Sequence, residues 1–305
     1  MLSKYDILNE LGKGICIFPL TEDNIKENSI NLSASEFAWA TISGDIYVDE
    51  NETDKDKKFS LKQDSKHYKK ITINAHNSAV IENGKNKYII LLPFSTTLIE
   101  TREVLSVSSY IGGTYHSKVG MVSKGLGHIG TMVGPNFSGD SLIAIHNTSQ
   151  ELVVINVKDT FVSVVFHYLD TPYTPNNPTI SGHTDKFAKL GLIVSEEQLA
   201  ILNADWKKNF DEVRFKMCES EEYSKLKEKV KKQKNEKLKK YFCKKNILIV
   251  AITAILLIAL YVVASIVDKN AGNTLWTDRY INVGCSGIIV AIVSFVVNRI
   301  KNNVK

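Results

Sequence analysis

The feature that most constrains this chain is an uninterrupted apolar segment near its C-terminus, residues 247–267. It contains 21 residues without a charged residue, a proline or a glycine. A helix needs roughly 20 residues to cross the ~30 Å hydrocarbon core of a bilayer, so this segment is long enough to span one. Thr253, Tyr261 and Ser265 are too few to form the polar stripe of a helix in a soluble domain. The sequence therefore predicts a transmembrane helix.

A second, weaker apolar segment covers residues 280–298, after a short loop that contains the turn residues Gly272 and Asn273. Gly287 and Ala291 are four residues apart, so they share a helix face that allows a neighbouring helix to approach closely. We predict a second transmembrane helix, and thus a hairpin. Its small-residue face packs either against the first span or in an oligomer that lines a pore.

Positive charge flanks the predicted hairpin on both outer sides. Residues 225–245 carry eleven lysines and two glutamates in a chain whose formal net charge is +5. Arg299 and Lys301 follow the second span. The positive-inside rule then predicts a two-span membrane protein with both termini in the cytoplasm. The position of the lysine run favours anionic lipid as its partner over nucleic acid, although a solvated helix explains it equally well.

The region before the membrane, residues 195–245, is predicted to be a helical stalk. Ser195 and Gln198 have the spacing of a capping box at a helix N-terminus. Apolar residues then recur at intervals of three and four, which indicates one face of a helix or helix pair. These residues are Leu199, Leu202, Trp206, Phe210, Val213 and Met217.

The N-terminal part of the chain shows the pattern of an all-β sandwich or barrel. Short β-branched or alternating segments are separated by turn residues, and Asn83-Gly84 is a typical hairpin turn. Residues 1–11 predict a short leading helix. The expected strands are 70–74, 78–81, 88–92, 141–145, 151–157 and 161–166.

Several segments of this domain together resemble the deoxycytidine triphosphate (dCTP) deaminases. Residues 7–35 (ILNELGKGICIFPLTEDNIKENSINLSAS) resemble that family's opening helix, strand and x-S-x-D-x-R-L segment. Residues 101–107 (TREVLSV) resemble its T-x-E-x-V-x-L strand. Residues 115–139 resemble its central motif, G-R-S-S-L-A-R followed by D-P-G-W-S-G. Residues 146–149 (HNTS) and the strand 160–168 follow in the same order.

This resemblance implies a dUTPase-like (β-clip) domain over residues 1–175, followed by a linker or arm over residues 176–194. The same fold includes the dUTP pyrophosphatases, so it also implies a homotrimer with sites between subunits. In an alignment with the family, three residues replace the triphosphate-binding R-S-S, and two more lie in the segment that resembles D-P-G-W-S-G. The resemblance implies that these five residues bind the nucleotide. They are His116, Ser117, Lys118, Gly134 and Asn136.

The departures from the family pattern argue against catalysis. Ala144 stands where the deaminases have their general-acid/base glutamate, and Gly134 stands where the family has an aspartate. Deamination needs a group that activates water and moves its proton, which alanine cannot do. His116, His128 and His146 lie in the former site region and offer an alternative base or metal ligand, but isolated histidines are more often structural. We therefore assign no catalytic residue, metal ligand or cofactor.

The sequence is most consistent with a catalytically inactive, dCTP-deaminase-like sensor. Its nucleotide-binding state would be passed to the membrane hairpin, as in an effector of antiviral defence or a regulator of nucleotide supply. One alternative is an active, membrane-tethered dCTP deaminase or dUTP pyrophosphatase. Another is a trimeric platform that binds proteins.

Overall fold

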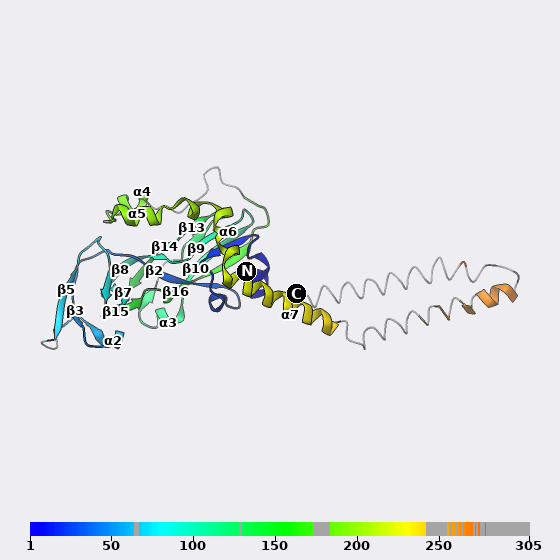
Figure 1. The fold of residues 1–305 in the computed structure, drawn as a ribbon, viewed down its shortest axis with the longest axis horizontal. Helices are drawn as coiled ribbons and strands as arrows, with labels where there is room; N and C mark the ends of the chain where they lie inside the picture. Colours follow the sequence, from blue (N-terminus) through cyan, green and yellow to red (C-terminus); the bar gives the residue numbers. More distant parts are fainter. Residues whose placement is uncertain are drawn as a thin grey trace. The chain divides into compact units, whose positions relative to one another are not determined.

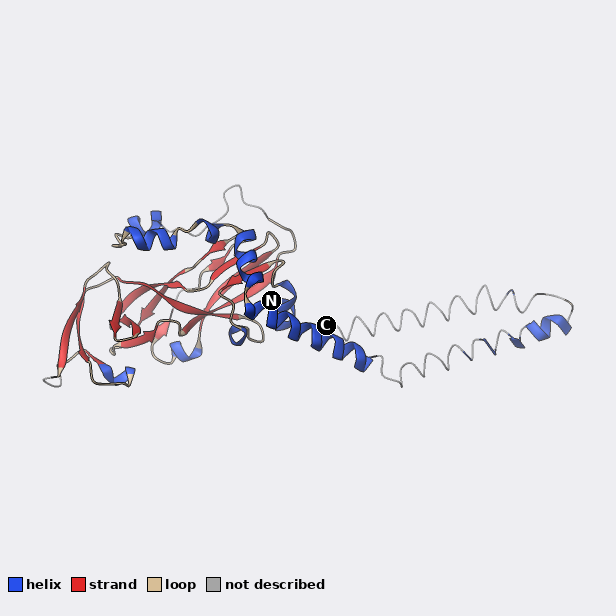
Figure 2. Ribbon diagram, viewed as in Figure 1, coloured by secondary structure: helices blue, strands red, loops and turns tan. Residues whose placement is uncertain are grey.

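The computed structural model describes residues 1–63, 67–127, 130–173 and 184–241, together with scattered positions between 255 and 278. The chain divides into two compact units, Met1–Val230 and Lys231–Lys305. The first unit contains the described strands and is mostly β (Figures 1 and 2).

The largest sheet is antiparallel and has seven strands within the described residues. Its long central strand, β2, lies between β8 and β16. From one edge to the other the strands are β11 (Leu126–Gly127), β14 (Leu142–Asn147), β8 (Ser95–Thr101), β2 (Ile30–Ala40), β16 (Thr160–Tyr168), β10 (Ile111–Ser117) and β12 (Met132–Val133).

Three smaller sheets, each of three strands in the described chain, complete the domain. The first consists of β1 (Ile15–Phe18), β9 (Val104–Val107) and β13 (Ser138–Gly139). The second consists of β15 (Val153–Asn156), β7 (Asn86–Leu91) and β6 (Val80–Asn83). The third consists of β4 (Phe59–Ser60), β3 (Gly44–Asp49) and β5 (Tyr68–Ile73).

Helical elements lie at both ends of this unit's sequence and in its connections. The short ones are α1 (Lys4–Glu10), η1 (Glu22–Asn24), α2 (Lys55–Lys58), α3 (Val119–Val122) and α4 (Thr184–Lys189). The C-terminal ones are α5 (Glu196–Leu202), η2 (Asp205–Lys208), α6 (Phe210–Glu219) and α7 (Glu221–Tyr241).

The strand pattern predicted from the sequence is confirmed. Each predicted strand overlaps an observed one, and β6 and β7 form the expected hairpin with Asn83 opposite Asn86. Gly84 in that turn has φ of +61°, which glycine adopts without a steric penalty. The leading helix is α1, which Ser3 begins with a capping box.

The core depends on β2, whose residues Ile30 to Ser35 are all buried. Residues 30–35 (INLSAS) alternate apolar and polar residues, the pattern of a strand with one solvated face, yet the structure buries both faces. The pairing of β2 with β8 shifts register between Ala34 and Ala38, so the strand bulges there. Such a bulge redirects side chains on either side of it.

The described part of the predicted linker, residues 184–194, is docked on the sheet. The Trp39 ring packs against Phe187 with ring centroids 5.0 Å apart, and its indole nitrogen donates to the carbonyl of Ile193 at 3.2 Å. Leu192 and Leu202 complete this cluster. The segment is therefore held by an aromatic anchor.

The region predicted as a stalk begins with the expected capping box at Ser195. A continuous helix through Met217 is wrong, because α5 ends at Leu202 and α6 starts only after Asn209. The Asn209 side chain accepts from the amide of Asp211 at 2.8 Å and so caps the new helix. A helix pair does not describe the region either, because α5, η2, α6 and α7 follow one another in it. Helices α5 and α6 bury their apolar residues against different clusters.

Helix α6 packs against β1 as part of the main core. Val213 and Met217 are fully buried, and the Met217 sulfur accepts from the amide of Ile17 at 3.3 Å. The hydroxyl of Tyr223, in α7, donates to the carbonyl of Leu11 at 3.2 Å. The helices through Val230 therefore form one compact unit with the β domain.

The predicted span 280–298 lies wholly outside the described residues, and 247–267 lies outside them except for scattered positions. Among the helices that are described, none combines the length and apolar character that crossing a bilayer requires.

The packing of α6 predicts where the soluble part can be cut. A fragment of residues 1–193 lacks Val213, Met217 and Leu226, each worth about 1.5–3 kcal/mol when buried. Because domains are stable by only about 5–15 kcal/mol, we expect this fragment to be unfolded or to melt far below residues 1–230. Circular dichroism melts of the two fragments test this. Equal melting temperatures would show that the helices are dispensable.

Candidate functional site

Three of the predicted site residues, His116, Ser117 and Lys118, lie together at the end of β10. The Lys118 ammonium group donates to the carbonyl oxygen of Thr160 at 3.3 Å and also to the hydroxyl of that residue. Burial, and secondarily the charge of Lys26, lower the pKa of Lys118. A cation that is partly desolvated and close to another cation favours an anion, so this end of β10 suits a phosphate group.

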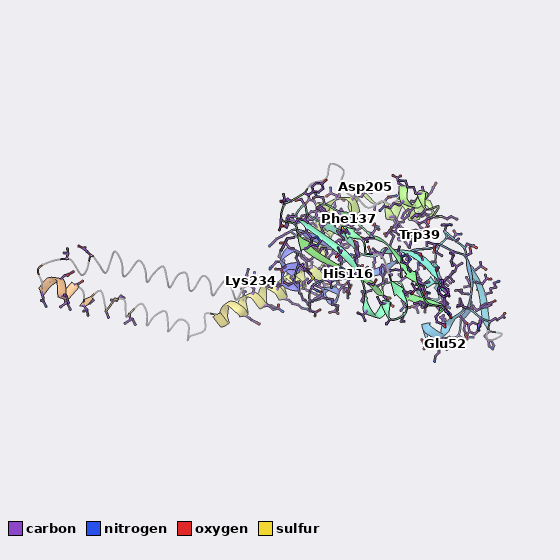
Figure 3. All side chains as sticks on the ribbon, turned by 180° about the vertical axis from the view of Figure 1, so that it is seen from behind. Trp39, Glu52, His116, Phe137, Asp205 and Lys234 are labelled. Atoms are coloured by element: carbon purple, nitrogen blue, oxygen red, sulfur yellow. The ribbon has the colours of Figure 1, made fainter. Side chains whose placement is uncertain are left out.

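His116 faces the same side of the sheet as Asn31, which belongs to the segment 7–35 whose sequence resembles the opening of the dCTP deaminases. In the strand register His116 is opposite Ser163, and Ser163 is opposite Asn31. The Ser163 hydroxyl donates to the Asn31 side-chain oxygen at 2.7 Å, and an imidazole nitrogen of His116 lies 2.9 Å from the Thr114 hydroxyl. The structure thus joins two separate sequence motifs in one polar row across β2, β16 and β10. Figure 3 labels His116, one member of this row.

Gly134 and Asn136 do not join this group within one chain. Val133 pairs with Gly113, so Gly134 lies near the start of β10, about 13 Å from His116 at ~3.3 Å per residue. Asn136 has φ of +58°, and its side-chain amide donates to the carbonyl of Tyr173 at 3.0 Å. The five predicted residues therefore form two groups at opposite ends of β10.

The two described histidines of this set, His116 and His146, do not form a joint site. His146 is on β14, where its ring nitrogen lies 2.8 Å from the Thr96 hydroxyl. Between β14 and β10 stand three strands, which places His146 roughly 19 Å from His116 at ~4.8 Å per strand. His128 lies outside the described residues. No cluster of metal-ligating side chains occurs in the described chain.

A buried charged cluster, which no sequence pattern indicated, lies beside the connection that carries Gly134 and Asn136. Asp140 and Lys207 are both buried and form an ion pair at 2.7 Å. Ser138 donates to the carbonyl of Lys207 at 2.8 Å. Glu100 lies close by and is fully buried. Nothing in the sequence around Lys207 distinguishes it from the neighbouring Lys208. Its place in the cluster follows from tertiary contacts alone.

Burial is the main cause of a strongly raised pKa for the Glu100 carboxyl group, and the charge of Asp140 raises it further. Lys207 acts in the opposite direction but is weaker. Burial also raises the pKa of Tyr115, whose hydroxyl contacts that of Ser141. The cluster therefore holds one ion pair and one carboxyl group that favours its neutral form.

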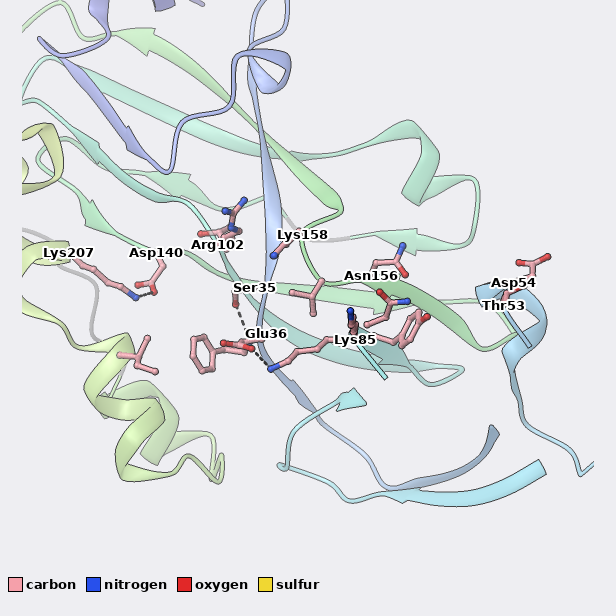
Figure 4. Close-up of a pocket in the computed structure, with 17 residues that line it drawn as sticks. Ser35, Glu36, Thr53, Asp54, Lys85, Arg102, Asp140, Asn156, Lys158 and Lys207 are labelled. Atoms are coloured by element: carbon pink, nitrogen blue, oxygen red, sulfur yellow. Dashed lines mark hydrogen bonds and ion pairs between the residues drawn. The ribbon is translucent and has the colours of Figure 1, made fainter. Parts of the chain in front are cut away.

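A hollow of about 910 Å³ lies on one side of this cluster, lined in part by Asp140 and Lys207 (Figure 4). None of the five predicted site residues lines it. Most of its polar lining comes from β2, from the hairpin before β7 and from the turn after β15.

By sequence, the chain is distantly similar to a known protein. No family model matches the chain. A dCTP deaminase from Thermococcus sibiricus is 27% identical over 104 residues, which are 34% of this chain and 65% of that relative. The chain thus spans less than two thirds of the length of that curated relative.

Solved structures of low similarity come from the same families. The dCTP deaminase of Agrobacterium tumefaciens covers 55% of this chain and 47% of its own, with 9% identity and a TM-score of 0.36. The dUTPase of phage phi11 of S. aureus covers 33% of this chain and 90% of its own, with 17% identity and a TM-score of 0.26. The resemblance found in the sequence is thus matched by a distant similarity to a curated dCTP deaminase. The described residues form a mostly β domain followed by helices, as expected.

The raised pKa of Glu100 predicts a pH-dependent stability. Between the ordinary value of 4.5 and the raised folded value, the folded state binds more protons than the unfolded state. Stability therefore falls as the pH rises through that window, by up to about 1.4 kcal/mol per pH unit. Glu100→Gln removes this titration.

We expect the free energy of unfolding of Glu100→Gln, relative to the natural protein, to increase from pH 5 to pH 8 in urea titrations. Glu151→Gln changes an exposed glutamate and serves as the matched control. A constant difference across this pH range would show that Glu100 is ionised in the fold.

Proposed function

We propose that this chain is a membrane-held nucleotide sensor whose β domain no longer catalyses a reaction. The observation that carries the proposal is the link from the predicted nucleotide site to the C-terminal helices. The connection that begins at Gly134 ends at Asp140, which forms the buried ion pair with Lys207. A ligand that shifts this connection therefore acts directly on the segment that leads into α6.

Nucleotide binding is supported by the distant similarity to a dCTP deaminase and by the end of β10. Lys118 and Lys26 supply positive charge there, and Ser117 supplies a hydroxyl group. Lysine attracts phosphate as a point charge, without the two-pronged geometry of arginine.

A trimer would reconcile the two separated groups of site residues. Gly134 and Asn136 lie at the far end of β10 from Lys118, so the two groups are not adjacent within one chain. We propose that Gly134 and Asn136 of one copy meet His116, Ser117 and Lys118 of the next, as the resemblance to a trimeric family implies.

Loss of catalysis is supported by Ala144, which lies on β14 opposite Leu98. Neither Ala144 nor its cross-strand partner Leu98 can transfer a proton, and glycine stands at position 134. The chemistry of water activation is therefore missing at both positions that the family pattern uses.

Membrane attachment is supported by the two apolar segments and by the lysine run that precedes them. At the described positions of the first segment, Ile255 and Ile258 are 65% and 64% exposed. Large apolar side chains at that exposure favour lipid or another apolar partner over water. We propose that nucleotide binding changes the packing of the hairpins, in the manner of an effector of antiviral defence or of nucleotide supply.

Nucleotide binding is tested by thermal melts of the full-length chain with dCTP, dUTP, dTTP and cyclic dinucleotides. A ligand at a hundred times its dissociation constant adds about 2.7 kcal/mol, which raises the melting temperature measurably. We expect one of these nucleotides to raise the melting temperature. The substitution Lys118→Ala should abolish this rise, whereas Lys189→Ala, at an exposed position, should leave it unchanged. Turnover of dCTP or dUTP would instead establish an enzyme, and no shift with any nucleotide would favour a protein-binding platform.

The link through Asp140 and Lys207 is tested in liposomes that hold a fluorescent dye. The double variant Asp140→Leu, Lys207→Met replaces a buried ion pair by apolar side chains, a change that is often neutral for stability. We expect it to keep nucleotide binding but to lose nucleotide-dependent dye release. Lys208→Met, which alters only a solvent-exposed pair with Asp205, is the control. Unchanged release in the double variant would exclude this route.

A further inference from the structure

The 910 Å³ hollow is distinct from the predicted nucleotide site and is lined by an excess of cations. Five lysine or arginine side chains line it, against three carboxylates. Ligand pockets commonly have volumes of about 300–1,000 Å³ and a few convergent polar groups, so its size suits a small molecule. Its residues come from separate parts of the sequence, and Figure 4 shows Arg102, Lys158 and Lys85 around it.

Two of its three carboxylates are already neutralised within the fold. Glu36 forms an ion pair with Lys87 at 2.5 Å, and Asp140 pairs with Lys207 at 2.7 Å. These pairs account for two of the five cations as well. The remaining cations are Arg102, Lys158 and Lys85.

The three remaining cations form no ion pair with any residue in the described part of the chain. The carboxylate next to Arg102 in the sequence, Glu103, instead accepts from the amide and the hydroxyl of Ser33, each at 2.7 Å. Arg102 therefore keeps its guanidinium group available for an anion in the hollow.

The backbone fixes Arg102 and Lys158 on either side of β2. The amide of Arg102 donates to the carbonyl of Ser33, and the amide of Lys158 donates to that of Ala34, both at 2.8 Å. These are neighbouring residues at the start of the β2 bulge. Both cations are thus attached to a rigid central strand, which lowers the cost of ordering them around a ligand.

Lys158 also has an unusual backbone conformation. Its φ is +77°, in the left-handed region that a lysine rarely adopts. Asn156 stabilises the turn, because its side-chain amide donates to the Asp159 carboxylate at 2.8 Å. Backbone strain of this kind costs of order 1–3 kcal/mol and tends to persist where a function uses it.

The rest of the lining offers hydrogen bonds and aromatic surface. Ser35, Asn86 and Asn156 present neutral polar groups, and Phe37 and Tyr88 present rings. The lining is therefore suited to a ligand with an anionic group and an uncharged part.

We propose that this hollow binds a phosphate-bearing small molecule through Arg102 and Lys158, with Lys85 at its rim, as a second ligand site. Phosphate is the anion that the geometry favours, because an arginine can donate two parallel hydrogen bonds to it while a lysine adds charge. The site does not depend on Lys118 or on the nucleotide site at β10, so either site can exist without the other.

Isothermal titration of the full-length chain with inorganic triphosphate tests the proposal. We expect Arg102→Gln, Lys158→Gln to weaken binding at this site by at least about tenfold, as loss of charge-assisted hydrogen bonds predicts. Lys13→Gln, Lys189→Gln removes the same charge from exposed positions and is expected to leave binding unchanged. Lys118→Gln is also expected to leave this site intact, which separates it from the nucleotide site.

Equal weakening in the Lys13, Lys189 control would overturn the proposal, because it would reveal a nonspecific charge effect. Undiminished binding in the Arg102, Lys158 variant, or no binding to the natural protein, would overturn it as well. Loss of binding in Lys118→Gln alone would assign the triphosphate to the β10 site.

Chemical acetylation of lysines in the natural protein provides a second test that needs no variant. We expect triphosphate to slow the acetylation of Lys85 and Lys158 several-fold, and that of Lys13 and Lys189 not at all, as measured by mass spectrometry of peptides. Equal rates with and without triphosphate at Lys85 and Lys158 would contradict binding in the hollow.

Discussion

The interior of the domain is constrained by the need to give each buried charge a partner, above all Lys207 and Asp140. Both side chains are nearly excluded from water, so either charge alone would be strongly destabilising. The pair therefore holds η2 against the connection between β13 and β14. Glu100 lies in the same cluster, where burial and then the charge of Asp140 raise its pKa, so the neutral form of this carboxyl group is favoured beside the paired aspartate.

Strand β2 connects the two regions to which we assign ligands. Asn31, near its start, belongs to the polar row with Ser163 and His116, whereas Ser35 lines the hollow. The bulge that begins at Ala34 separates these residues. An irregular strand can thus present polar groups to two sites while it remains hydrogen-bonded in the centre of the sheet.

The fold of the domain does not depend on Gly134 and Ala144, the two positions on which the proposed loss of catalysis rests. The core is built from apolar residues on β1, β2, β9 and β16, and none of these depends on the residues at positions 134 and 144. Fold and catalysis have separate physical requirements, since one needs buried apolar area and the other a few placed polar groups. A domain of this fold can therefore bind a ligand without a proton-transfer residue.

The sequence predicted the elements whose signal is local. Ser195 and Gln198 marked a helix start, Asn83-Gly84 marked a hairpin, and β-branched segments marked strands, because capping, turn chemistry and side-chain alternation act over a few residues. The sequence also placed His116, Ser117 and Lys118 together, since they are consecutive. It did not separate Gly134 and Asn136 from them, because strand register decides that distance.

By itself, then, the sequence determined the mostly β class, the distant dCTP deaminase-like character and the apolar segments that predict a membrane hairpin. Only the tertiary structure decided that α6 belongs to the core, that Lys207 meets Asp140, and that Arg102 and Lys158 converge on one hollow. These contacts join residues 50 or more positions apart, and no local propensity encodes such a pairing. They follow from burying apolar surface and from the need to give every buried charge a partner.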